Sequence, residues 1–120
     1  MQTSLVRAAI AAVDSMLAIG QAAAQGLDCG SGPLPKSYGK TPWLVYACSD
    51  EKSLVVVATE DNPGHPFFFK LFVKDGVRYV VGEGEGKKAV TAPAYDELSK
   101  LSEADLAALI KAARTPGAPQ

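Results

Sequence analysis

Apolar residues form short runs through the middle of the chain and change to a helical spacing near its end. Four apolar runs, separated by polar or Gly- and Pro-containing turns, predict β-strands at residues 43–48, 54–58, 67–73 and 77–81. Because the connections between them are short, an antiparallel meander is the simplest topology. The pattern therefore predicts an α+β fold, in which a four-stranded antiparallel meander packs against C-terminal helices.

Two helices are predicted after the last strand. Thr91 can cap a short helix with Pro93 in its first turn. Ser102 and Asp105 then resemble a capping box, with Asp in place of the usual Glu, at the start of a second helix. The apolar stripe of that second helix comprises Leu106, Leu109, Ile110 and Ala113.

The segments that flank these elements are predicted to be irregular. Residues 25–42 contain many Gly and Pro residues, so we interpret them as a loop. Residues 115–120 contain the helix stop signal Pro116-Gly117 and are expected to be a frayed tail. Residues 25–120 then form a single small α+β domain.

The turn between the last two predicted strands decides which side chains share a face. If Asp75-Gly76 is a two-residue turn, Val73 pairs with Arg78. If Lys74-Asp75-Gly76 is a three-residue loop with Gly76 in the left-handed conformation, Val73 pairs with Val77. We favour the second alternative, because it collects most apolar side chains on one face: Phe67, Phe69, Leu71, Val73, Val77, Tyr79 and Val81.

The other face of this predicted hairpin mixes aromatic and basic residues. It carries Phe68, Lys70, Phe72 and Arg78, together with Val80. One alternative is that the C-terminal helices cover it, with the Lys and Arg side chains reaching to its rim. The other is that it binds a protein partner or a second copy of the chain, since aromatic residues and Arg are favoured at interfaces. We take Phe68, Lys70, Phe72 and Arg78 as the candidate partner-binding residues.

The first residues resemble an export signal. An apolar stretch ends in Ala22-Ala23-Ala24, which predicts a signal peptide over residues 1–24 and a mature N-terminus near Gln25. The alternative is a retained amphipathic helix, because polar and apolar positions of the same segment separate on a helical wheel. Export would place Cys29 and Cys48 in an oxidising compartment, where we expect them to form a disulfide worth roughly 3 kcal/mol. The predicted localisation is periplasmic or secreted.

Composition narrows the possible partners. The formal net charge is −1, with no basic cluster, so we expect no binding to nucleic acid. No apolar run after residue 24 is long enough to span a bilayer, and Asp28 before Cys29 disfavours lipidation, so no stable membrane anchor is expected. With one histidine and no CxxC pair, the sequence predicts neither a metal site nor a cofactor.

Catalysis would have to use His65, the single histidine. A small hydrolase could pair it with Asp61 and with Ser49 or Ser53. No nucleophile-elbow motif accompanies it, so a surface turn between Pro residues is the stronger interpretation and we assign no catalytic residue.

The first alternative to a general binding protein, placed ahead of the hydrolase, comes from a resemblance. Tyr46-Ala47-Cys48, a polar turn and the strand Leu54–Val57 are similar to the strand opening of small periplasmic inhibitors of C-type lysozyme. The resemblance implies an exported, disulfide-containing β-barrel whose loops enter an enzyme cleft. The family's Ser-Gly-x-x-Tyr loop has no counterpart at Gly82-Glu83-Gly84. The main expectation from the sequence is a non-catalytic, exported binding protein of unknown ligand.

Overall fold

The structure is a computed structural model that describes residues 27–115. The predicted signal peptide and residues 116–120 of the predicted tail lie outside the described residues. The described elements follow one another along the chain as β1 (Ser31–Tyr38), β2 (Thr41–Ala47), β3 (Leu54–Ala58), β4 (Phe67–Lys74), β5 (Val77–Gly84), α2 (Lys88–Ser99) and α3 (Glu103–Arg114).

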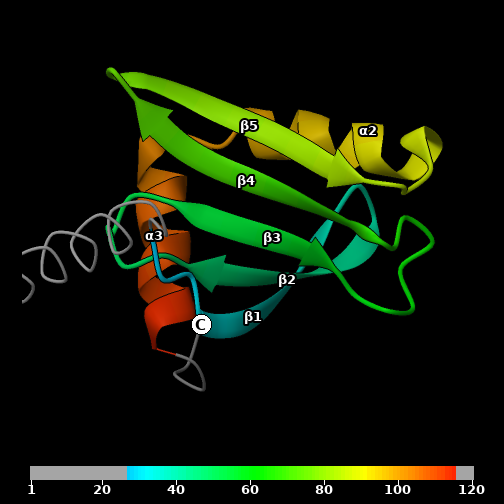
Figure 1. The fold of residues 1–120 in the computed structure, drawn as a ribbon, viewed down its shortest axis with the longest axis horizontal. Helices are drawn as coiled ribbons and strands as arrows, with labels where there is room; N and C mark the ends of the chain where they lie inside the picture. Colours follow the sequence, from blue (N-terminus) through cyan, green and yellow to red (C-terminus); the bar gives the residue numbers. More distant parts are fainter. Residues whose placement is uncertain (1–26, 116–120) are drawn as a thin grey trace, which may run out of the picture.

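The strands form one antiparallel sheet in the order β1-β2-β3-β4-β5 (Figure 1). Each strand pairs with its neighbour in sequence, so the sheet is a meander, and the two helices follow it. The predicted α+β class and meander are confirmed. The sheet has five strands, however, and not four.

The additional strand is β1, which lies within the segment predicted to be a loop. The prediction was wrong because Pro is compatible with an edge strand, where one row of backbone N–H groups needs no partner. A register shift between Ser31 and Leu34 accommodates Pro33. The turn to β2 consists of Gly39 and Lys40, with φ of 59° and 65°, as a two-residue hairpin turn requires.

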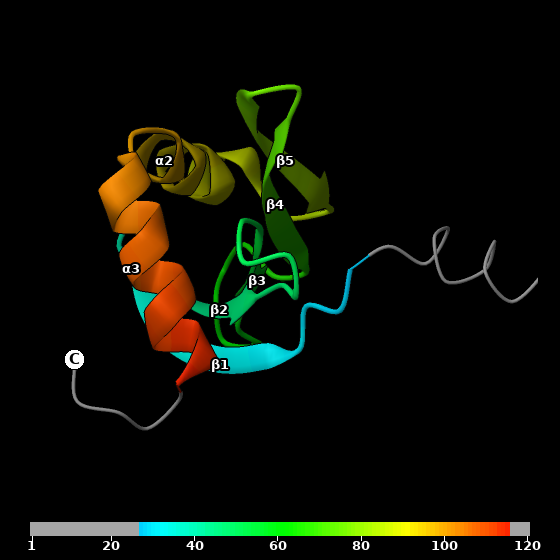
Figure 2. The ribbon, with the colours of Figure 1, turned by 90° about the vertical axis from the view of Figure 1, so that its left-hand side faces the viewer.

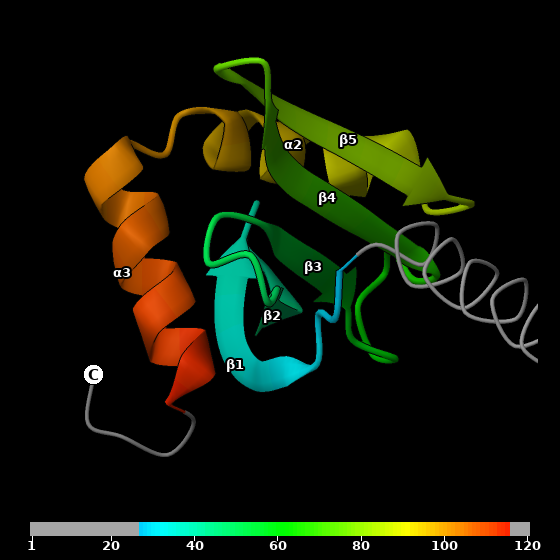
Figure 3. The same ribbon diagram turned by 60° about the vertical axis from the view of Figure 1, so that its left-hand side comes forward.

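Both helices lie on the same side of the sheet (Figures 1 and 2). α3 packs against β1 and β2, and α2 packs against β1 and β5. Figure 3 shows this arrangement from a third direction, with α2 behind β5 and α3 beside β1. The core between the layers comprises Leu34, Tyr38, Trp43, Val45, Ala47, Leu54, Val56, Ala58, Phe69, Leu71, Ala94, Leu98, Leu109 and Ala113.

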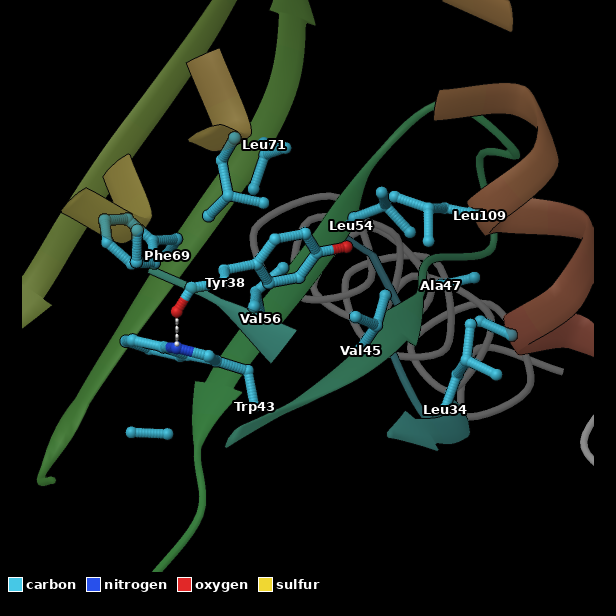
Figure 4. Packing of buried hydrophobic residues seen from close by; sticks show 14 residues of the cluster. Leu34, Tyr38, Trp43, Val45, Ala47, Leu54, Val56, Phe69, Leu71 and Leu109 are labelled. Atoms are coloured by element: carbon cyan, nitrogen blue, oxygen red, sulfur yellow. Dashed lines mark hydrogen bonds between the residues drawn. The ribbon is translucent and has the colours of Figure 1, made fainter. Parts of the chain in front are cut away.

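Trp43 is the largest side chain of this core and is fully buried. Its indole Nε1 donates a hydrogen bond to the carbonyl oxygen of Tyr38 at 3.1 Å, drawn in Figure 4, and lies 2.9 Å from Thr41 Oγ1. Its ring centroid lies 5.2 Å from that of Phe69 in β4. The indole thus satisfies its one polar group at the β1–β2 turn while its apolar surface reaches the middle of the sheet.

The β4–β5 turn differs from the one we favoured. Val73 pairs with Arg78 and Lys74 pairs with Val77, so Asp75 and Gly76 form a two-residue turn. Their φ values are 53° and 76°, as a type I′ turn requires, and the twist of that turn matches the twist of the strands. Gly76 has the predicted positive φ, but the predicted Val73–Val77 pair is wrong.

Of the two predicted helix N-termini, one is confirmed and the other is wrong. Ser102 Oγ accepts from the backbone N–H of Asp105 and Asp105 accepts from the N–H of Ser102, both at 3.0 Å, so the predicted capping box is confirmed. These hydrogen bonds lower the pKa of Asp105. The predicted cap at Thr91 is wrong: α2 begins at Lys88, Thr91 is buried within the helix and Pro93 lies beyond the first turn.

Gly39 allows the β1–β2 turn to approach α2, which yields a prediction. A Cβ atom at Gly39 would lie 2.7 Å from the backbone nitrogen of Ala94, whereas one at Gly76 would meet nothing within 4 Å. Both glycines have positive φ. We expect Gly76→Ala to lower the free energy of unfolding by about 1 kcal/mol, through the left-handed penalty alone. Gly39→Ala should cost about 2 kcal/mol or more, because the clash adds to that penalty.

Urea unfolding followed by the fluorescence of Trp43 measures both variants. Equal losses at Gly39 and Gly76 would show that the approach of the turn to α2 does not contribute to stability.

The hydroxyl of Tyr38 yields a second prediction. It is buried and has no hydrogen-bond partner within residues 27–115. Burial, together with the carboxylate of Glu97, raises the pKa of Tyr38 to about 12. Because an unpaired buried hydroxyl costs free energy, Tyr38→Phe should leave stability at pH 7 unchanged or raise it.

The pH dependence gives an independent test of Tyr38. The unfolded chain ionises this phenol near its ordinary pKa while the folded chain keeps it neutral, so stability should fall as pH rises from about 10 to 12. Tyr38→Phe should lose less stability over this interval in parallel chemical unfolding experiments. A variant that is less stable than the wild type at pH 7 would show that the hydroxyl does have a partner.

Candidate protein-binding face

The side of the sheet opposite the helices has no covering layer among residues 27–115 (Figure 2). We call this side the open face. Alternation along the paired strands places a largely apolar set of side chains on it, most of them half-buried. From β2 to β5 the set comprises Pro42, Leu44, Tyr46, Val55, Val57, Phe68, Lys70, Phe72, Lys74, Val77, Tyr79, Val81 and Glu83.

Two aromatic rings stack where the open face extends beyond β3. Phe72 and Tyr79 are directly paired across β4 and β5. Their ring centroids are 5.4 Å apart, and the angle between their planes is 19°. Tyr79 remains 42% exposed, and Val77, on the same face, is 52% exposed. The stack therefore presents an apolar surface of fixed shape to the surroundings.

An ion pair lies beside the apolar residues of the open face. Lys70 Nζ is 2.6 Å from a carboxylate oxygen of Glu83, and the two residues sit diagonally on β4 and β5. Both side chains are 47% exposed, so the pair is screened by water and contributes little to stability in the free protein. Its hydrogen-bonding capacity remains available to a partner.

The structure brings together three of the four residues predicted for partner binding. Phe68, Lys70 and Phe72 lie on the open face, but Arg78 lies on the helix side, where its guanidinium contacts the carbonyl oxygen of Ser99 at 3.5 Å. The two-residue turn moves Arg78 to that side and moves Tyr79 to the open face. Grouping Arg78 with the two Phe residues was wrong. The Asp75-Gly76 dipeptide, a typical type I′ sequence, was the signal for the correct grouping.

Arg78 lines a groove on the helix side instead. The groove has a volume of about 440 Å³ and lies between the β4–β5 turn and the start of α3. Val73, Leu106 and Ile110 give it an apolar floor, while Arg78 and Glu103 supply charges. It is separated from the open face by the thickness of the sheet.

The predicted disulfide is confirmed. Cys29 and Cys48 are bonded with an S–S distance of 2.05 Å, which ties the segment before β1 to the end of β2. Ser49 N–H donates to the carbonyl oxygen of Asp28 at 2.7 Å beside the bond. Cys48 is buried, and the guanidinium of Arg114 in α3 contacts its carbonyl oxygen at 3.5 Å. The bond therefore fixes the start of the domain close to the last helix.

The residues considered for catalysis are not brought together. Ser49 and Ser53 precede β3 and His65 follows it, so they lie at opposite ends of a five-residue strand, roughly 17 Å long. The hydroxyl of Ser53 instead donates to Asp50 at 2.7 Å, and Asp61 accepts from the hydroxyl of Thr59. His65 is exposed in the loop before β4.

Residues 27–115 contain no group of three or more His, Cys, Asp or Glu residues placed to hold a metal ion. No helix within them has the length and apolar character needed to cross a membrane.

Comparison of the chain with protein-family models, with curated proteins and with solved structures found no match. Residues 27–115 do not form the β-barrel that the resemblance to lysozyme inhibitors implies. The sheet is open, with β1 and β5 as its two edges, and helices cover one side.

Proposed function

We propose that this chain is an exported, non-catalytic binding protein that holds a protein partner on the open face of its sheet. One observation carries the proposal: the sheet has apolar side chains on both sides, and the two helices cover only one of them. Contiguous apolar surface on a small folded domain is typical of an interaction site.

The chemistry of the open face favours a protein as the ligand. The stacked Phe72 and Tyr79 provide a rigid aromatic contact with few torsions to immobilise on binding. Lys70 and Glu83 offer a donor and an acceptor close together, so a partner surface with one acidic and one basic group can be oriented against them. The best fit is an apolar protein surface with such a charge pair at its rim.

The Cys29–Cys48 disulfide supports the exported part of the proposal. Such bonds form and persist in oxidising compartments, which include the periplasm and the exterior of the cell. The bond also limits local opening of the N-terminal segment next to the sheet. A binding face that is assembled before the partner arrives loses less entropy on association.

The proposal is tested by photo-crosslinking in the native compartment. A photoreactive amino acid replaces Tyr79 on the open face, and the matched control places it at Lys111, an exposed position on α3. We expect the Tyr79 position to yield a defined adduct with another protein and the Lys111 position to yield none. Phe68→Ser combined with Phe72→Ser in the same chain should abolish the adduct, because it removes the apolar contact.

A second pair of substitutions distinguishes the open face from the groove. Val73→Ser with Leu106→Ser alters the groove and should leave the Tyr79 adduct unchanged. Loss of the adduct only in this groove variant would overturn the proposal. Thermal unfolding of both double variants is the control for folding. If Phe68→Ser with Phe72→Ser unfolds the monomer, the rings serve stability and the open face is not a binding site.

A further inference from the structure

The two edges of the sheet are protected to very different degrees. In β1, the register set by the two-residue turn at Gly39-Lys40 points the backbone polar groups of Pro35 and Ser37 away from β2. Pro35 has no N–H to offer, and Pro33 lies in the register shift near the start of the strand. Proline at an edge is a common means of preventing pairing with another chain.

The edge at β5 has no such protection. Counting outward from the Asp75-Gly76 turn, the N–H and carbonyl groups of Arg78, Val80 and Gly82 point away from β4. Within residues 27–115, β5 pairs with β4 alone, and these groups have no other backbone partner. The strand contains no Pro, and three Val residues and Tyr79 favour β-structure.

The surroundings of this edge can accept another strand. α2 lies in the helix layer, behind β5 and not in the plane of the sheet (Figures 1 and 3). The Tyr95 ring of α2 has its centroid 6.4 Å from that of Phe69 in β4 and remains 45% exposed. On the helix side of the sheet, an added strand would contact this apolar ring.

We infer that β5 pairs with β5 of a second copy of this chain, antiparallel and centred on Val80, to form one continuous sheet. In this register Val80 faces Val80 of the second copy, Arg78 faces Gly82 and Tyr79 faces Val81. No two like charges are opposed in this register. The ring of Phe67 fills the space beside Gly82, 2.7 Å from where a Cβ atom would lie, so Arg78 of the second copy faces an apolar ring there. Aromatic and β-branched residues paired across strands are a stabilising combination.

The occupant is a second copy because self-pairing closes the assembly. A two-fold axis at Val80 pairs the unprotected edge with itself, so both remaining edges are the Pro-protected β1 strands. The assembly therefore ends at two copies. The same axis is perpendicular to the sheet, so the two open faces lie side by side. This inference does not depend on what the open face binds.

The test uses one position with two substitutions. Arg78→Pro and Arg78→Ala both remove the guanidinium and its contact with Ser99, but only Pro removes the outward N–H. Sedimentation of the disulfide-bonded protein over a dilution series should show a dimer for the wild type and for Arg78→Ala. Arg78→Pro should weaken dimerisation by about tenfold or more, since each copy loses a hydrogen bond between strands.

Hydrogen exchange of the wild type provides the second measurement. The amides of Arg78, Val80 and Gly82 should be protected in concentrated samples and exchange faster on dilution. A monomeric wild type at every concentration would overturn the inference. A dimer that persists in the Arg78→Pro variant would also overturn it. The same holds for a dimer that dissociates in the Phe68→Ser, Phe72→Ser variant, if the amides of Arg78, Val80 and Gly82 exchange freely in the wild type. The crosslinking of the open face can fail or succeed independently, because it identifies a different protein.

Discussion

The sheet has two apolar faces, and the chain supplies one layer of helices to cover them. α2 and α3 take the side formed by Trp43, Val56 and Phe69, where burial is nearly complete. Burying that side stabilises the domain, because each large apolar side chain removed from water contributes about 2 kcal/mol. On the other side, each side chain is covered only by its neighbours within the sheet, so Phe68 and Phe72 remain half-buried.

The number of residues in the β4–β5 turn decides which β5 side chains lie on each face of the sheet. Two residues at Asp75-Gly76, in place of three, rotate every side chain of β5 to the other side. Tyr79 thereby stacks on Phe72, and Arg78 reaches the end of α2. The open face gains an aromatic pair beside the Lys70–Glu83 ion pair, and Lys74 lies at its edge opposite Val77. This composition is suited to contact with another protein.

The two candidate surfaces of this domain use different interactions. The open face would bind through apolar area and a few oriented charges, so side-chain substitutions should control it. The β5 edge would bind through backbone hydrogen bonds, so the decisive change is the removal of an N–H. The two surfaces meet along β5, so dimerisation there would double the extent of the open face.

Several features were predictable from the sequence, because each depends on local periodicity or on residues of one chemical type. They are the apolar runs of β2 to β5, the capping box of α3 and the Cys29–Cys48 pair. β1 was not predictable, because a Pro-containing segment can be a strand only at an edge, and edge position is a property of the whole sheet. The β4–β5 register was misjudged because the favoured turn was the one that sorted most apolar residues of the hairpin onto one face, whereas in the structure both faces carry them. The tertiary structure alone decided that both faces are apolar and that the helices cover one, since the packing of α2 and α3 depends on side chains distant in sequence.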